Sequence, residues 1–174
     1  MEINGVNPQK RFAAASAAES VKSGMVIGLG SRSTAEIVIR IIGEKVKHGL
    51  QIIGVPTSHE SEDLARALGI PLSTLADHPE LDLTIDGADE VELGSLDLIK
   101  GRGGALLREK IVASSSRQLI IVVDESKIVN HLGSHGRWAF AEFRDVYEME
   151  TDFEAKVEGE FNKMIESVTE KAAV

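Results

Sequence analysis

The chain has 174 residues, which suits one domain that buries roughly two-thirds of its unfolded surface without a disulfide or a structural metal. It carries 19 Lys and Arg against 28 Asp and Glu, and this net charge of −9 argues against nucleic acid or an anionic membrane as a partner. Cysteine is absent, which excludes disulfides and thiolate metal sites, and no apolar run approaches the ~20 residues of a membrane span. The default prediction is a cytoplasmic protein, or a protein of the plastid stroma if a transit peptide was removed.

The first predicted helix begins at Asn7-Pro8, a capping residue followed by proline at the first helical position, and ends before Gly24. Its apolar residues recur at three-residue steps: Phe12, Ala15, Ala18 and Val21. We expect this face to pack against the rest of the domain.

Short apolar runs and helical patterns then alternate along the chain. The predicted strands span residues 25–29, 51–55, 82–86 and 118–124, and the predicted helices span 33–49, 60–68 and 104–115. Ser33 and Glu36 have the spacing of a capping box at the start of the second helix. This alternation predicts an α/β fold, a Rossmann-like doubly wound and mostly parallel sheet with helices on both faces.

The pattern changes after Lys127. Between Phe143 and Val168, apolar residues recur at steps of three or four in an acidic background, which predicts one long or two shorter amphipathic helices. We therefore expect an α/β domain at 1–133 and a divergent helical C-terminal segment at 134–174. This segment either covers the sheet or mediates assembly as an acidic tail.

Polar clusters follow the predicted strands, at the edge where open parallel sheets bind their ligands. These clusters are "GLGSRST" at 28–34, "PTS" at 56–58, "DGADE" at 86–90 and "DESK" at 124–127. Each cluster alone is also ordinary turn chemistry, but four at one edge indicate a site.

The first cluster has the character of an anion site. Ser31, Ser33 and Thr34 precede a helix, where unpaired N–H groups and the helix dipole attract anions, although an ordinary N-cap uses the same residues. The spacing of the glycines does not match a dinucleotide fingerprint, and the Gly-Lys pair of a P-loop is missing. A small phosphoester is the better fit.

The third cluster places two carboxylates, Asp86 and Asp89, after a buried strand. A close pair suits acid/base chemistry or hydroxyl binding, and the alternative is a metal site. No histidine neighbours the pair in sequence, and we interpret the five histidines as surface or structural residues: His48, His59, His78, His131 and His135.

Glu109 lies on the face of its predicted helix that is otherwise apolar. A carboxylate there needs a partner or a function, and burial would raise its pKa toward the range of a general base. The alternative is a glutamate at the edge of the stripe, paired with a lysine. Lys100 and Lys127 supply the positive charge that a phosphorylated, oxyanion-forming substrate needs.

Four segments, in this order and spacing, resemble the type A ribose-5-phosphate isomerases. They are "GLGSRSTAEIV", "DLTIDGADEV", "KGRGGALLREKIVA" and "IVVDESK". The longer stretch "GIPLSTLADHPELDLTIDGADEV" is most similar to plant and related members, and the resemblance covers residues 8–133.

The resemblance implies an aldose-ketose isomerase that interconverts D-ribose 5-phosphate and D-ribulose 5-phosphate, in the pentose phosphate pathway and the Calvin cycle, without metal or cofactor. It implies that Glu109 is the base, that Lys100 stabilises the oxyanion, and that Asp86 and Asp89 assist ring opening and hold hydroxyls. The further substrate-binding residues that it implies are Lys10, Ser31, Arg32, Ser33, Thr34, Gly87, Ala88, Gly101, Arg102, Gly103 and Lys127. The resemblance is also compatible with a homo-oligomer.

Two features depart from the family pattern. Arg32 replaces a glycine in the anion loop, where its side chain either obstructs the phosphate or adds a cation. The sequence after 133 does not follow the small α+β lobe of the family. The alternative function is therefore a catalytically impaired sugar-phosphate-binding pseudoenzyme or sensor, and a third reading is an interaction protein that acts through its tail.

Overall fold

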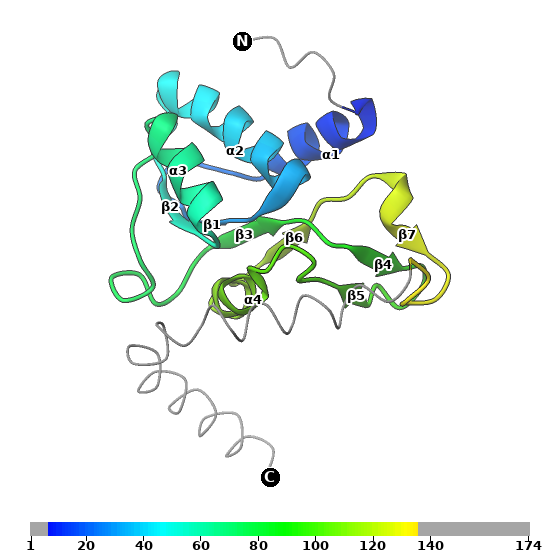
Figure 1. Cartoon of the computed structure of the whole chain (residues 1–174). Coiled ribbons are helices and arrows are strands. Elements are labelled where there is room, and N and C mark those ends of the chain that lie inside the picture. Colours follow the sequence, from blue (N-terminus) through cyan, green and yellow to red (C-terminus); the bar gives the residue numbers. More distant parts are fainter. Residues whose placement is uncertain (1–6, 136–174) are drawn as a thin grey trace, which may run out of the picture. The chain divides into compact units, whose positions relative to one another are not determined.

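The computed structural model describes residues 7–135, and these contain a four-stranded parallel sheet (Figure 1). Its strands lie in the order β2 (Ile53–Pro56), β1 (Val26–Leu29), β3 (Leu83–Asp86) and β6 (Leu119–Ile121). All four strands predicted from the sequence are confirmed. The last is shorter than the predicted 118–124, because its partner β3 ends at Asp86 and the ladder cannot continue beyond it.

Helices cover both faces of this sheet, which confirms the predicted fold class. Helices α1 (Pro8–Ala18), α2 (Arg32–Lys47) and α3 (His59–Ala67) lie on one face, and α4 (Leu106–Ser114) lies on the other (Figure 1). The larger core forms beneath the first three helices, where α2 buries one apolar stripe that includes Ile39 and Ile42. On the opposite face, Val112 of α4 packs with Val55 and Leu81.

The predicted apolar stripe of the first helix is confirmed only in its second half, where Ala18 and Val21 are buried. Phe12 is 79% exposed and Ala15 is also exposed, whereas Ala14, Ala17 and Ala18 are buried. Three-residue steps rotate by less than a full turn of 3.6 residues, so the predicted stripe drifts around the helix. The helix also ends at Ala18 rather than close to Gly24.

The predicted capping box at Ser33 and Glu36 is wrong. Helix α2 begins at Arg32, its N-cap is Ser31, and no side chain caps its first turn. The Ser31 hydroxyl is hydrogen-bonded instead to Thr57 Oγ1, at 2.7 Å. A contact with the residue that follows β2 therefore replaces the local cap.

A second, small sheet was not predicted. It contains β5 (Leu98–Ile99), β4 (Glu90–Glu92) and β7 (Ile128–Val129), with β4 antiparallel to β5 and parallel to β7. Strands of two or three residues are too short to show a periodic pattern. A 3₁₀ turn, Glu125–Lys127, precedes β7.

The small sheet matters because it positions the polar residues that flank it. The backbone N–H of Asp89 donates to the carbonyl of Ile99, which brings Asp89 and Lys100 to the same end of the β4–β5 pair. The predicted helical segment 134–174 lies outside the described residues except for its first two positions. Within residues 7–135, no helix is both long and apolar enough to cross a bilayer.

Candidate active site

The polar clusters predicted at the strand ends meet at one edge of the main sheet. After β1, the N–H of Ser31 donates to Asp86 Oδ1 at the end of β3, at 3.0 Å. The Ser31 hydroxyl contacts Thr57, which follows β2. Gly30 allows the segment after β1 to lie this close to the end of β3, because a Cβ on Gly30 would overlap Asp86 Oδ1 and the carbonyl of Ile85.

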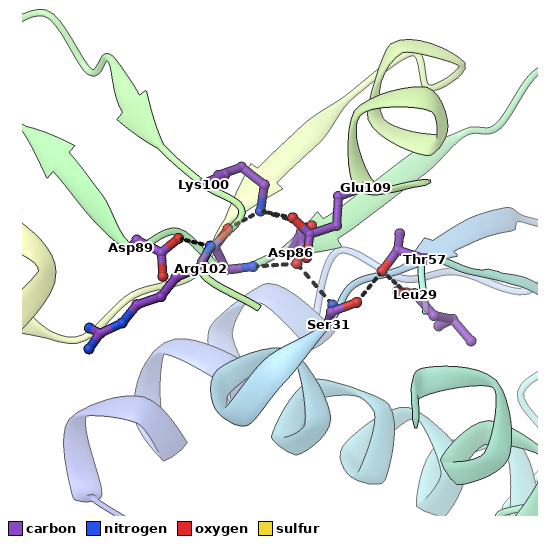
Figure 2. A network of polar contacts seen from close by, with 9 residues as sticks. Leu29, Ser31, Thr57, Asp86, Asp89, Lys100, Arg102 and Glu109 are labelled. Carbon is purple, nitrogen blue, oxygen red and sulfur yellow. Dashed lines mark hydrogen bonds and ion pairs between the residues drawn. The ribbon is translucent and has the colours of Figure 1, made fainter. Parts of the chain in front are cut away.

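Three charged side chains form the centre of the site, and we call them the Lys100 cluster: Asp86, Lys100 and Glu109. Lys100 Nζ lies 2.9 Å from Asp86 Oδ2 and 3.4 Å from Glu109 Oε2 (Figure 2). It also donates to the carbonyl of Gly87. Asp86 is 1% exposed and Glu109 is 4% exposed. One ammonium group therefore joins two buried carboxylates that come from β3 and α4.

Asp86 is held by more than the ammonium of Lys100. Its Oδ1 accepts hydrogen bonds from the backbone N–H groups of Ser31, at 3.0 Å, and Gly87, at 2.7 Å. Both carboxylate oxygens are thus occupied. This saturation fixes the carboxylate and, through it, the position of Lys100.

Glu109 is the least satisfied member of the cluster. Burial raises its pKa above the ordinary glutamate range, and the charge of Asp86 raises it further, while Lys100 opposes the shift. The predicted buried position of Glu109 on α4 is confirmed, and the lysine partner of the alternative reading is also present. A buried carboxylate with a raised pKa and one cationic neighbour is suited to accept and return a proton near neutral pH.

Asp89 lies apart from the Lys100 cluster, on the other side of the loop. Its Oδ2 accepts a hydrogen bond from the backbone N–H of Arg102, at 2.9 Å. Figure 2 shows the Arg102 side chain extending away from Lys100 and Glu109. Asp89 thus stabilises the loop that follows Lys100. Its carboxylate is partly buried and lies in a different part of the site from Asp86.

The second half of the site is an anion rim, which we define by five residues: Lys10, Ser31, Ser33, Thr34 and Lys127. Ser31 and Thr34 are buried at the start of α2, whereas Ser33 is exposed and accepts a hydrogen bond from Lys10 Nζ at 2.9 Å. Lys10 comes from α1, so two helices meet at this rim.

Asp124 forms an ion pair with Lys10 of the rim. Its Oδ2 lies 3.7 Å from Lys10 Nζ. Burial opposes ionisation of Asp124, but hydrogen bonds from Ser126 and the charges of Lys10 and Lys127 outweigh it and lower the pKa of this carboxyl. A carboxylate that stays ionised holds the Lys10 ammonium group beside Ser33, at the start of α2.

The other predicted site residues lie on the two loops that border the cluster. Gly87 and Ala88 connect β3 to β4, and Gly101 and Gly103 follow Lys100. Gly101 has φ +106°, a conformation that favours glycine. A Cβ on Gly103 would overlap the Arg32 guanidinium, so this exposed side chain reaches from α2 to the Lys100 loop.

The list of predicted site residues omitted two buried groups that support the site, Thr57 and Asp124. Thr57 is fully buried, and it donates to the carbonyl of Leu29 at 3.0 Å as well as contacting Ser31. Both residues belong to clusters recognised at the strand ends. Thr57 directly follows β2 and Asp124 lies three residues after the end of β6, and these positions were a usable signal, but only the contacts reveal what the two residues hold.

Two of the predicted structural histidines contact glutamates outside the site. His135 Nδ1 lies 3.0 Å from Glu90 Oε1, and His131 Nδ1 lies 3.3 Å from Glu92 Oε1. Among residues 7–135, no three or more His, Asp or Glu side chains are arranged to hold a metal ion.

Known proteins are similar to most of the part of the chain that the structure describes. Residues 53–138 match the family model of ribose 5-phosphate isomerase A (phosphoriboisomerase A). Over 126 residues, the chain is 58% identical to ribose-5-phosphate isomerase A of Synechococcus sp. (strain JA-3-3Ab), an alignment that covers 72% of this chain and 55% of the relative.

Two solved structures are similar to the same part. The ribose 5-phosphate isomerase A of Methanocaldococcus jannaschii is 46% identical with a TM-score of 0.70, and covers 72% of this chain and 56% of its own. A D-ribose-5-phosphate isomerase in complex with phospho-erythronic acid is 43% identical with the same TM-score of 0.70, and these coverages are also 72% and 56%. The chain spans about half the length of these relatives. Over the part that the structure describes, it belongs to the ribose-5-phosphate isomerase A family.

Proposed function

We propose that this chain interconverts D-ribose 5-phosphate and D-ribulose 5-phosphate by moving a proton between C1 and C2. The observation that carries the proposal is the position of Glu109, a buried carboxylate with a raised pKa that lies 3.4 Å from the ammonium group of Lys100. The membership of the family agrees with this reaction.

Glu109 is the base of the proposed reaction. Its carboxylate removes the proton from C2 of the open-chain aldose, and the electrons of the broken C–H bond form the C1–C2 double bond of an enediolate. The carbonyl oxygen on C1 takes up the negative charge, beside the Lys100 ammonium. Glu109 then returns the proton to C1, the hydroxyl proton moves from O2 to O1, and the ketose results.

Asp86 and Asp89 act on the sugar and on the geometry of the site. Asp86 orients Lys100 through a 2.9 Å contact, while Asp89 supports the loop that follows Lys100. We assign to both carboxylates the binding of sugar hydroxyls and assistance in ring opening, because the resemblance to the family implies these roles for Asp86 and Asp89.

The anion rim binds the phosphate group in this proposal. The Ser31 hydroxyl contacts Thr57 and caps no N–H of α2, so the N–H groups of the first turn are available to a ligand. Lys10, which contacts Ser33, adds positive charge at this end of the helix, and we assign Lys127 to the same phosphate on the basis of the resemblance to the family. Local charge of this kind is needed because the chain as a whole carries −9.

The test is the isomerisation of ribose 5-phosphate by the purified chain, with Glu109→Gln as the inactive variant and Glu44→Gln, an exposed change on α2, as the matched control. We expect ketose to form with the unchanged chain and with the control. Glu109→Gln should lower kcat by about 10²- to 10⁴-fold, the usual contribution of a general base.

Calorimetry with ribose 5-phosphate separates this function from the alternative. Binding without any isomerisation at high protein concentration would contradict the enzyme and support a sugar-phosphate-binding pseudoenzyme. Homo-oligomeric assembly and a cytoplasmic or plastid location stay predictions from the sequence.

A further inference from the structure

Arg32 has a backbone conformation that residues with a Cβ seldom adopt. Its φ is +75°, in the left-handed region. The residue lies at the first position of α2, between Ser31 and Ser33 of the anion rim. Residues held in a disfavoured backbone conformation cluster at functional sites, so this conformation indicates a function for the Arg32 side chain.

The Arg32 side chain spans the two halves of the site. Its Nε, Cζ and Nη2 atoms occupy the place that a side chain on Gly103 would take. Gly103 follows Lys100 by three residues, on the loop that leads into α4 and Glu109. The guanidinium of Arg32 therefore lies against the loop of the Lys100 cluster, while its backbone belongs to the anion rim.

The guanidinium is exposed and carries five N–H donors. The hydrogen bonds and ion pairs found among residues 7–135 do not involve it. Hydrogen bonds from its own backbone and from Ser58 lower the pKa of Glu60, and the charge of Arg32 contributes to this shift without forming an ion pair. The cation thus remains available to a ligand.

We propose that Arg32 is a specificity-determining residue, which donates hydrogen bonds to the phosphate group of a sugar phosphate bound between the anion rim and the Gly103 loop. The proposal rests on the proposed function. A planar guanidinium can hold two oxygens of a phosphate dianion at once, whereas a neutral sugar offers it no comparable partner. Arg32 therefore favours phosphorylated over unphosphorylated pentoses.

The test compares Arg32→Ala, Arg32→Gly and Arg32→Lys with the unchanged chain. The control is Arg40→Ala, which removes the same charge from the same helix two turns further on. Two quantities are measured for each protein: the dissociation constant of inorganic phosphate by calorimetry, and kcat and KM for ribose 5-phosphate.

We expect Arg32→Ala and Arg32→Gly to weaken phosphate binding and to raise KM by roughly tenfold, which is the effect of losing one charge-assisted hydrogen bond. The value of kcat should change much less. Arg32→Lys should lie between these variants and the unchanged chain. Arg32→Gly should also melt about 4 °C above Arg32→Ala, because glycine accepts the left-handed conformation. Arg40→Ala should bind phosphate normally.

Phosphate affinity that is unchanged or higher in Arg32→Ala would overturn the proposal, because the side chain would then be a bystander or an obstruction. The proposal would also be overturned if Arg32→Gly bound phosphate with normal affinity while Arg32→Ala did not. That result would show that backbone strain at position 32, and not the charge of the side chain, governs phosphate binding. The phosphate measurement needs no turnover. If the unchanged chain fails to isomerise ribose 5-phosphate, the proposed function fails while the role of Arg32 is still decided.

Discussion

The Lys100 cluster and the anion rim lie next to each other but are built in opposite ways. In the cluster, the polar groups contact one another: Lys100 contacts two buried carboxylates, and both oxygens of Asp86 accept hydrogen bonds. In the rim, the first turn of α2 has no side-chain cap, and Lys10 is held near it at the surface.

This difference separates the tasks of the two regions. A group in the cluster sets the pKa of its neighbours, so its loss should change the rate and its dependence on pH. A group in the rim offers donors that only a ligand can use, so its loss should change affinity. Asp86 connects the regions because it accepts from Ser31 with one oxygen and from Lys100 with the other.

The largest effect within this comparison should come from Lys100→Met. We expect kcat to fall by about 10²- to 10³-fold, the loss associated with one group that stabilises an oxyanion. Glu109 acts as a base only when it is ionised, so activity rises with pH through its pKa. Lys100 lowers that pKa, and without it the acid limb of the pH–rate profile should move to higher pH.

The control for this variant is Lys110→Met, an exposed change on α4. It should leave both the rate and the acid limb unchanged. An acid limb that stays in place in Lys100→Met would mean that the base is a group other than Glu109.

Lys10→Met should affect only the rim. Because Lys10 supplies charge beside Ser33, we expect KM for ribose 5-phosphate to rise about tenfold while kcat and the pH profile stay constant. Steady-state kinetics check this, with the exposed Lys22→Met as the matched control. A fall in kcat equal to the rise in KM would contradict the separation of tasks.

Thr57→Val tests whether the contact between Thr57 and Ser31 keeps the first turn of α2 free of a side-chain cap. The change leaves the buried Ser31 hydroxyl without its partner, while the Leu29 carbonyl still accepts from the backbone N–H of residue 57. The unpaired hydroxyl should lower the free energy of unfolding by about 1–3 kcal/mol. The freed hydroxyl can then cap α2 and compete with the anion, so phosphate affinity should fall a few-fold.

Chemical denaturation and calorimetry measure these two effects. Thr57→Ser keeps the hydroxyl and should preserve phosphate affinity. If the serine variant loses as much affinity as the valine variant, the hydroxyl is not what keeps the first turn of α2 open.

The smallest effect concerns stability. The pKa of Glu109 is higher in the folded chain than in the unfolded chain. As the pH rises above the pKa of Glu109 in the unfolded chain, ionisation of this side chain therefore favours unfolding. Glu109→Gln should therefore be more stable than the unchanged chain at neutral pH, and this gain should vanish below the ordinary glutamate pKa. Thermal unfolding at several pH values measures it, and a gain that persists in acid would contradict this reading.

Much of the candidate site could be predicted from the sequence because it depends on local pattern. Glycine-bounded apolar runs locate the strands, and the polar clusters that follow them must meet at one edge of a parallel sheet. Helical spacing likewise assigns Glu109 to the buried face of α4. The resemblance to the family then assigned roles to these positions, and the comparisons confirm the family.

Other features could not be predicted, since they depend on contacts between distant segments. The buried face of α1 is set by where its alanines meet α2, not by its most hydrophobic residue, Phe12. The cap of α2 is decided by Thr57, which is 26 residues away from Ser31.

The sequence by itself determined the order along the chain of the helices and of the main-sheet strands, the edge at which ligands meet the sheet, and the identity of the ionisable groups there. These properties follow from periodicity and from residue chemistry, which act over a few positions. Only the tertiary structure decided that Lys100 joins Asp86 to Glu109 and that Arg32 reaches Gly103. Such contacts depend on how distant segments of the chain pack together, because burial and charge set a pKa only when the groups share one environment.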